Sequence, residues 1–167
     1  MQQTGGRKAS RLHLETTYGE DTYRRATRDV HRCAGLHRHA AGVLGQPAVC
    51  DIEASVRFYS DVLGVDVQYA DPDFAALSVD GHEFMLHADH TYDTHPWHGA
   101  LLANERRGLG AELRLMGHDA DDVERRAVAS GAVVLRPAAT KGHGIREVIV
   151  EDPDGYTWAI GSLVDAR

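Results

Sequence analysis

The pattern of hydrophobic and polar residues occurs twice along the chain. One copy begins at Asp51 (DIEASVRFYSDVLGVDV) and the other at His118 (HDADDVERRAVASGAVV). In each copy a polar start precedes an amphipathic stretch, a glycine follows thirteen residues after the first residue, and a valine-containing run comes next. Apolar residues three or four positions apart share one face of an α-helix. Each copy therefore predicts a helix followed by a strand.

Residues that favour helix termini mark both predicted helices. Asp51 and Asp119 are candidate N-caps, because a carboxylate accepts hydrogen bonds from the unpaired backbone N–H groups of a first helical turn. Gly64 and Gly131 stand where the helices would stop, since glycine readily takes the left-handed conformation of a helix C-terminus. The residues predicted to form the buried stripes are Val56, Tyr59 and Leu63 in the first helix, and Val123 and Ala127 in the second.

Both copies also end alike. VDGHEFML (79–86) matches PDGYTWAI (153–160), and each is a turn with glycine in third place followed by an alternating strand. Each copy is then a strand, a helix and three strands. We predict an α+β fold of two β-α-β-β-β modules, which form a curved mixed sheet around a cleft with the helices on the outside.

These patterns set the expected domain boundaries. One domain is expected over residues 41–163, with module one at 41–90, a linker loop at 91–108 and module two at 109–163. The first strand is poor, because AAGVLGQPAVC contains two glycines and a proline. Residues 1–40 lack sustained periodicity, although EDTYRRATRDVHR could form a short helix. They are expected to be a basic N-terminal arm, either disordered or the result of a misassigned start site.

Charge is unevenly distributed and limits the partners to be expected. The net charge is −7, but residues 1–46 hold eight Lys/Arg against four Asp/Glu, whereas residues 47–167 hold ten against twenty-one. The acidic body argues against nucleic acid as a partner. Cys33 and Cys50 are too few for a disulfide framework or a zinc knuckle. Without a membrane-length apolar run or a signal-like N-terminus, we expect no membrane partner and a cytoplasmic protein.

Four motifs in order resemble the vicinal-oxygen-chelate superfamily, over about residues 48–163. They are DIEASVRFYSDVLGV, GAELRL, KGHGIRE and EDPDGYTWAI. The superfamily includes glyoxalase I, extradiol dioxygenases, fosfomycin-resistance enzymes and bleomycin-resistance proteins. The resemblance implies modules that pair into a U-shaped cleft, and a possible homodimer.

Strand alternation predicts which side chains face that cleft, because successive residues point to opposite faces. In HEFMLH (82–87), the set Glu83, Met85 and His87 should face the cleft. In YTWAIG (156–161), the smaller set Thr157, Ala159 and Gly161 should do so. The bulky residues of these strands should pack under the helices, which makes Trp158 a core residue.

Metal-dependent members of the superfamily take ligands from the first and last strands of each module. By the resemblance, these positions correspond here to Leu44, Met85, Glu112 and Ala159. Only Glu112 among them is a ligand for a hard or borderline metal, and one carboxylate cannot hold a catalytic divalent ion. We therefore expect no metal and no cofactor, with a divalent metal as the less favoured alternative.

A histidine-rich stretch, MLHADHTYDTHPWHG (85–99), could supply an improvised metal site, because imidazole is a common metal ligand. His87 should point into the cleft, while His90, His95 and His98 fall in the connection between the modules. Their spacing fits no compact motif, and Pro96 argues against a helical pair. The favoured interpretation is a polar loop that lines or covers a pocket.

Other residues favour a pocket for a polar ligand. On AELRLM, Glu112 and Arg114 share the cleft face and need partners, either each other in a structural ion pair or a ligand. TKGHGIRE presents basic side chains on a glycine-flanked loop, and Trp97 offers a stacking surface. The candidate ligand-binding residues are Met85, His87, Trp97, His98, Glu112, Arg114, His143 and Arg146.

Three hypotheses of function follow. The leading one is a metal-free small-molecule binder similar to bleomycin-resistance proteins, whose acidic body suits a cationic ligand. The second is a lyase, isomerase or dioxygenase that uses Glu112 as general base or the improvised histidine metal site. The third is a regulatory or interaction module whose basic arm, residues 1–40, contacts a partner.

Overall fold

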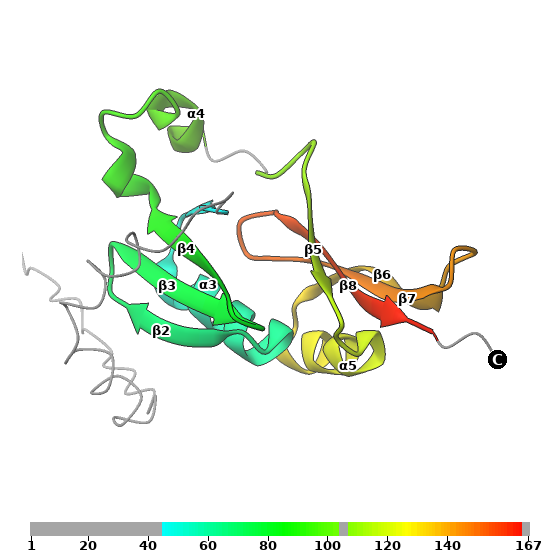
Figure 1. Cartoon of the computed structure of the whole chain (residues 1–167). Coiled ribbons are helices and arrows are strands. Elements are labelled where there is room, and N and C mark those ends of the chain that lie inside the picture. Colours follow the sequence, from blue (N-terminus) through cyan, green and yellow to red (C-terminus); the bar gives the residue numbers. More distant parts are fainter. Residues whose placement is uncertain (1–44, 104–106, 165–167) are drawn as a thin grey trace, which may run out of the picture.

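The computed structural model describes residues 45–103 and 107–164 (Figure 1). The expected basic arm, residues 1–40, and the resemblance-derived ligand position Leu44 lie outside these ranges. Module one follows the predicted order of elements, with its helix divided into an α-helical and a π-helical part. Its elements are β1 (Ala48–Val49), α3 (Ile52–Arg57), the π-helix η1 (Phe58–Leu63), β2 (Asp66–Ala70), β3 (Phe74–Val79) and β4 (His82–Ala88).

Module two repeats this order after a connection that carries two short helices. The connection holds the 3-10 helix η2 (Asp89–Tyr92) and α4 (His98–Leu102). Module two comprises β5 (Glu112–Met116), α5 (Ala120–Ser130), β6 (Val133–Thr140), β7 (Ile145–Glu151) and β8 (Thr157–Leu163). No helix among the described residues is both long enough and apolar enough to span a membrane.

The strands form two open sheets with the same topology. Their orders are β1-β4-β3-β2 and β5-β8-β7-β6. In each sheet the first strand runs parallel to the last, and the other neighbours are antiparallel. The prediction of an α+β fold with two β-α-β-β-β modules is confirmed. The described strands divide between two separate mixed sheets, one from each module.

Both helix starts and both helix ends match the prediction from the sequence. The Asp51 side chain accepts a hydrogen bond from the backbone N–H of Ala54 at 3.0 Å. Asp119 accepts two such bonds in the first turn of α5. Gly64 and Gly131 end the helices with φ angles of 75° and 76°. Asparagine and aspartate caps of this kind satisfy N–H groups that a helix cannot pair internally.

One hydrophobic core extends through both modules. Helices η1 and α5 contact each other and lie side by side in Figure 1, so the core is shared between the two halves. At its centre the Tyr59 ring meets the rings of Phe84 and Trp158 at 5.6 and 5.5 Å between centroids. Trp158 is only 8% exposed, which confirms its expected place in the core.

Each module also reaches into the other through its glycine turn. The carboxylate of Asp154, in the turn before β8, accepts hydrogen bonds from the backbone N–H of Cys50 at 2.8 Å and from the hydroxyl of Ser55 at 3.3 Å. Asp152 in the same turn accepts one from the Tyr59 hydroxyl at 2.8 Å. We call these contacts the cross-module clamp. The turn before β4 makes a corresponding but more exposed contact, from Asp80 to His118 at 2.8 Å.

Burial in the clamp shifts the protonation of its groups. Burial raises the pKa of Asp152 to about 6, because an ionised carboxylate loses water there, although the Tyr59 hydroxyl partly offsets this. Burial and the neighbouring Asp154 carboxylate raise the pKa of the Cys50 thiol to about 12. A thiol with that pKa is protonated at neutral pH and is a poor nucleophile. The clamp joins the two modules through hydrogen bonds to two buried carboxylates.

Candidate functional site: an aromatic surface on module one

The strand faces divide as alternation predicts. Leu86 and Ala88 of β4 belong to the hydrophobic core that the helices cover, as do Trp158 and Ile160 of β8. Met85 and His87 alternate with Leu86 and Ala88 along β4 and point to the opposite face of the sheet. We call this the outer face of each module, and the candidate site is built on it.

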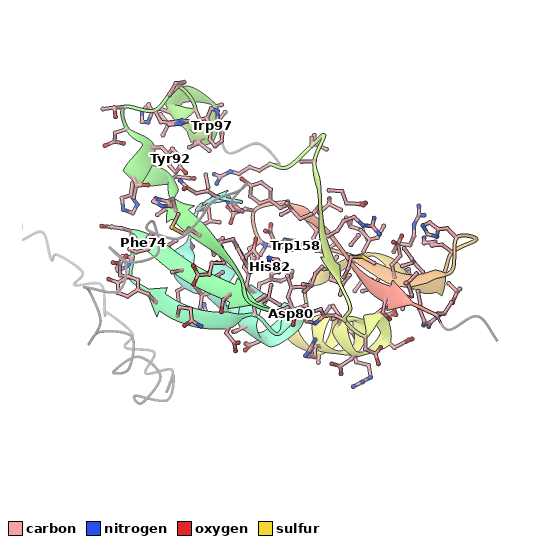
Figure 2. All side chains as sticks on the ribbon, viewed as in Figure 1. Phe74, Asp80, His82, Tyr92, Trp97 and Trp158 are labelled. Carbon is pink, nitrogen blue, oxygen red and sulfur yellow. The ribbon has the colours of Figure 1, made fainter. Side chains whose placement is uncertain are left out.

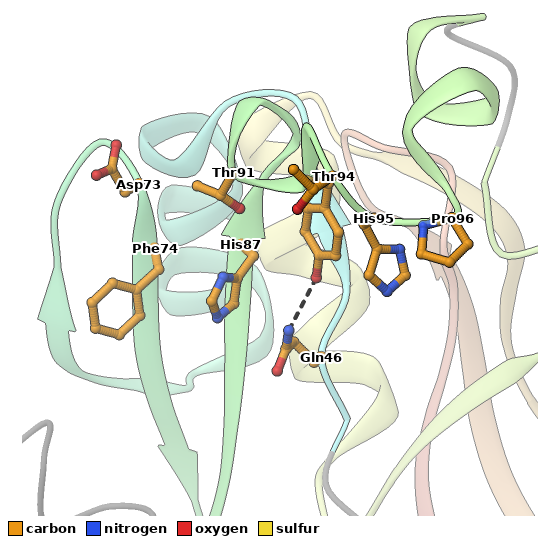
Figure 3. Close-up of a pocket in the computed structure, with 9 residues that line it drawn as sticks. Gln46, Asp73, Phe74, His87, Thr91, Thr94, His95 and Pro96 are labelled. Atoms are coloured by element: carbon orange, nitrogen blue, oxygen red, sulfur yellow. Dashed lines mark hydrogen bonds between the residues drawn. The ribbon is translucent and has the colours of Figure 1, made fainter.

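A cavity of about 480 Å³ lies at one end of the module-one outer face (Figure 3). Strands β3 and β4 supply its floor, since Phe74 and His87 are directly paired across them. The connection after β4 supplies its wall. The lining residues are Gln46, Asp73, Phe74, His87, Thr91, Tyr92, Thr94, His95 and Pro96.

Aromatic rings in contact run along this cavity from the sheet to the connection. Tyr69 stacks on Phe74 at 5.0 Å, and Phe74 lies 5.7 Å from the His87 ring. His87 lies 6.1 Å from Tyr92, which is 7% exposed. Tyr92 in turn stacks on Trp97 at 6.0 Å with only 16° between the planes. With His95, which contacts both Tyr92 and Trp97, these six residues form what we call the aromatic row.

Hydrogen bonds hold the row in place. The amide of Gln46 donates to the Tyr92 hydroxyl at 3.0 Å, shown as the dashed line in Figure 3. The backbone N–H of Trp97 donates to Nδ1 of His95 at 3.2 Å. The Tyr69 hydroxyl donates to Asp71. The row is therefore oriented by polar partners and does not rely on ring contacts alone.

Asp71 and Asp73 carry carboxylates beside the row, and Asp93 follows Tyr92 directly in the sequence. Asp73 lines the cavity and lies 2.9 Å from the His90 ring, and Asp93 lies 3.8 Å from the His98 ring. Burial alone would raise the pKa of Asp71, but hydrogen bonds from the Tyr69 hydroxyl and two backbone N–H groups hold that pKa below its usual value. An ionised carboxylate beside aromatic faces is an environment that attracts cations.

The outer face of module two is charged rather than aromatic. Arg114 donates to Glu112 at 2.6 Å and to Glu147 at 2.8 Å. Lys141 lies 3.6 Å from Glu147. Hydrogen bonds from Arg114 lower the pKa of Glu147, although its burial opposes this. The sequence left open whether Glu112 and Arg114 pair with each other or with a ligand. In the structure they form an ion pair with each other.

The structure brings together some of the candidate residues and separates others. Met85 and His87 share the outer face of β4. The Tyr92 ring contacts both His87 and Trp97 and so links these two candidates. His98 lies in α4, and His143 is an exposed residue of the β6–β7 turn. Arg146 points to the helix side of its sheet, where it pairs with Asp121 of α5. It does not share a face with Glu112 and Arg114.

Sequence reasoning missed Phe74, Tyr92 and Gln46, which line the cavity. The sequence did contain a signal for Phe74. The apolar stretch FAALSV (74–79) predicts a strand, and its alternation would show which of its residues share a face with Phe74. Tyr92 and Gln46 gave no local signal. They meet across 46 positions of sequence, which only the tertiary fold brings together.

The residues present do not fit the metal site that the superfamily implies. Met85 and Ala159 stand at two ligand positions without a donor for a divalent ion, and Glu112 is engaged by Arg114. Within residues 45–103 and 107–164, no group of three or more His, Cys, Asp or Glu side chains could hold a metal ion. The improvised histidine site finds no support in the geometry of His87, His90, His95 and His98.

Comparison with known proteins defines the class to which this fold and site belong. The family model for the Glyoxalase/Bleomycin resistance protein/Dioxygenase superfamily matches residues 44–160, and the chain belongs to this superfamily. No curated protein matches it significantly.

Solved structures of low sequence identity share the fold. A glyoxalase-related enzyme from Fulvimarina pelagi is 24% identical with a TM-score of 0.59, covering 73% of this chain and 87% of its own. A glyoxalase/bleomycin resistance protein/dioxygenase from Nocardioides is 20% identical with a TM-score of 0.57, covering 82% and 95%. TioX from Micromonospora sp. ML1 is 19% identical with a TM-score of 0.54, covering 75% and 100%.

Proposed function

We propose that this protein binds a small cationic molecule with an aromatic or apolar portion on the aromatic row, without a metal ion. The observation that carries the proposal is the cavity of about 480 Å³, which is lined by rings of the row and by the carboxylate of Asp73. Cavities of about 300–1,000 Å³ suit small ligands. A cation over the face of Trp, Tyr or Phe gains about 0.5–2 kcal/mol for each favourable contact.

Charge beyond the cavity supports a cationic ligand. Residues 47–167 carry twenty-one Asp and Glu against ten Lys and Arg. A surface with this balance raises the local concentration of cations and speeds their association, an effect that salt weakens. The ligand is held by rings and carboxylates in this proposal, and sequestration rather than chemistry is the expected outcome of binding.

A homodimer would complete the site. Module two exposes apolar side chains that the single chain leaves uncovered. We propose that two copies pair so that module two of one closes over the aromatic row of the other, as the resemblance to paired superfamily members suggests. The exposed residues concerned are Met116 (40%), Val133 (52%), Leu135 (44%) and Leu163 (75%). Light scattering coupled to gel filtration tests this directly.

Binding is tested by equilibrium dialysis against cationic glycopeptides and against benzyltrimethylammonium, with uncharged neopentylbenzene as the isosteric control. We expect saturable binding of the cations, lost in Tyr92→Ala and weakened by added salt. Val128→Ala is a matched apolar truncation at an exposed helix position, 66% accessible, and should leave binding unchanged. Equal binding of the neutral control would refute the cationic specificity, and no cation bound at high micromolar concentration would refute the proposal.

The alternative of a lyase, isomerase or dioxygenase is favoured by one observation. Glu112 and Arg114 are both about two-fifths exposed on the outer face, which places a carboxylate base beside a guanidinium that could stabilise an anionic intermediate. Metal analysis of protein purified without chelator discriminates between the two. Stoichiometric Zn, Ni, Mn or Fe that disappears in His87→Ala would favour the enzyme.

A further inference from the structure

Arg107 is the first described residue after the segment 89–103, which we call the connecting segment. Its side chain is only 9% exposed, and its guanidinium contacts four different parts of the molecule. It meets Asp89 at 2.7 Å, the backbone oxygen of Ala48 at 2.8 Å, Sγ of Cys50 at 3.1 Å and the Asp154 carboxylate at 3.4 Å. A planar guanidinium can donate in several fixed directions at once, which an ammonium cannot.

These contacts join the wall of the cavity to the body of the protein. Asp89 is the first residue of η2, and Tyr92, the most buried ring of the aromatic row, is the last. Ala48 belongs to β1 and Asp154 to the cross-module clamp. Arg107 therefore fixes the start of the connecting segment to both modules through one side chain.

Tyr92 is held by Gln46 and His90 lies beside Asp73, but the part of the connecting segment after Tyr92 contains no buried residue. None of the five residues of α4 is buried, and Trp97 is 53% exposed. Figure 1 shows α4 standing away from both sheets, and Figure 2 shows Tyr92 and Trp97 on this part of the chain, far from Trp158. A segment with few buried contacts opens at low free-energy cost unless its ends are anchored.

The backbone beside Arg107 is fixed as well. Its N–H donates to the backbone oxygen of Asp154 at 3.3 Å. Gly108 adopts φ +74°, and a Cβ there would come within 2.7 Å of the Tyr156 ring. Only glycine permits that approach. Arg107 and Gly108 are thus fixed against module two, with the Arg107 side chain directed at Asp89.

We propose that Arg107 is a positioning residue for the aromatic row, which holds Tyr92 and Trp97 in register with His87 and Phe74 by anchoring η2 to β1 and to the cross-module clamp. This positioning role is argued from the contacts of Arg107 and does not depend on the proposed function. The consequence for a ligand rests on the proposed function. Arg107 does not need to touch the ligand in this role.

Tryptophan fluorescence tests the position of the rings without any ligand. The chain has two tryptophans, and Trp158 is buried, so the signal lost in Trp97→Phe reports on Trp97. In Arg107→Lys we expect the acrylamide quenching constant of Trp97 to rise by about twofold, towards that of a fully exposed indole. Asp89→Asn removes the charge from the same contact while leaving Arg107 paired with Asp154, and should give a smaller rise.

Ser55→Ala is the matched control. It removes a hydrogen bond to Asp154 in the clamp but touches nothing in the connecting segment. It should lower the melting temperature without changing the quenching of Trp97. If Arg107→Lys and Asp89→Asn also lower only the melting temperature, Arg107 is merely structural and the proposal is wrong.

Binding of benzyltrimethylammonium to the same variants separates the two proposals. We expect about tenfold weaker binding in Arg107→Lys, because a loosened site must be ordered before it binds. Unchanged affinity together with increased quenching would show that the row is repositioned without serving the ligand, which overturns the role in binding. If the wild-type protein binds no cation, the proposed function fails, while the quenching data still decide whether Arg107 positions the row.

Discussion

The two modules share one topology, but the outer face of module one is aromatic and that of module two is charged. The repeat that aligns Met85 with Ala159 also aligns His87 with Gly161, and strand pairing then makes Phe74 the counterpart of Glu147. In module one these positions hold two tilted rings, Phe74 and His87, with centroids 5.7 Å apart, which line a cavity. In module two they hold a charged side chain that lies against a glycine. The same strand register thus carries part of an aromatic surface in one module and part of an ion-pair network in the other.

The glycine of module two is the more restrictive of these positions. A Cβ on Gly161 would collide with the backbone oxygen of Arg146 and approach Cα of Glu147 to 2.9 Å. We expect Gly161→Ala to lower the free energy of unfolding by about 3 kcal/mol or more, because backbone atoms must move. His87→Ala, at the counterpart position, should cost about 1 kcal/mol through lost ring contacts. Urea denaturation measures both, and equal losses would contradict the comparison.

The glycine turns before β4 and β8 should also contribute unequally to the free energy of unfolding. Asp154 is buried with several partners, whereas the side chain of Asp80 is 63% exposed beside His118. Asp154→Asn should therefore cost about 2–3 kcal/mol, since it weakens bonds to buried groups. Asp80→Asn should cost at most about 0.5 kcal/mol, as is usual for an exposed pair. Thermal and urea unfolding of the two variants would show whether module two supplies the tighter turn.

Titration of Asp152 offers a further test of the clamp. Its pKa rises from 3.8 to about 6 in the folded protein, which therefore binds this proton more tightly than the unfolded chain does. The free energy of unfolding should fall as pH rises from about 4 to about 6, by roughly 2–3 kcal/mol from this group. Asp152→Asn keeps an acceptor for the backbone N–H groups and should remove that step. A pH profile of urea stability parallel to that of wild type would contradict it.

Of the four predictions, removal of the module-two ion pairs should change the free energy of unfolding least. Arg114 is two-fifths exposed, so Arg114→Met should cost about 1–2 kcal/mol at neutral pH. Because Arg114 lowers the pKa of Glu147 below 4.5, its contribution is present above that pH and is lost as pH falls further. The variant should therefore lose less stability than wild type on acidification below pH about 4.5. Chemical denaturation at several pH values checks this.

Local sequence patterns predicted most of the fold but few of the residues at the candidate site. Asp51, Gly64 and their counterparts mark the helices because capping is decided within a few residues. The sequence also predicted a weak first strand, and β1 is indeed short, covering only Ala48–Val49. Pro47 is tolerated beside it because the strand lies at the sheet edge and Pro47 offers only its carbonyl, which accepts from the His87 N–H at 3.1 Å.

The site depends on contacts that no short window contains. Arg146 was grouped with Lys141 and His143 as one loop, but β7 begins at Ile145, and alternation then turns Arg146 to α5 and Glu147 to the outer face. The π-helical turns of η1 were likewise beyond a helix-period pattern, although Tyr59 and Leu63 are buried as that pattern predicts. Arg107 gave no signal, because its partners lie up to 59 residues away.

The cross-module clamp has a consequence for how the chain folds during synthesis. The start of α3 hydrogen-bonds to Asp154 across 104 positions of sequence, and Tyr59 to Asp152 across 93. Module one leaves the ribosome first, yet the backbone N–H of Cys50 and the Tyr59 hydroxyl meet these partners only after the turn before β8 has been made. Contacts this distant in sequence slow folding, because a long loop must close before they form. The half of the protein translated first therefore depends on the half translated second to complete its contacts.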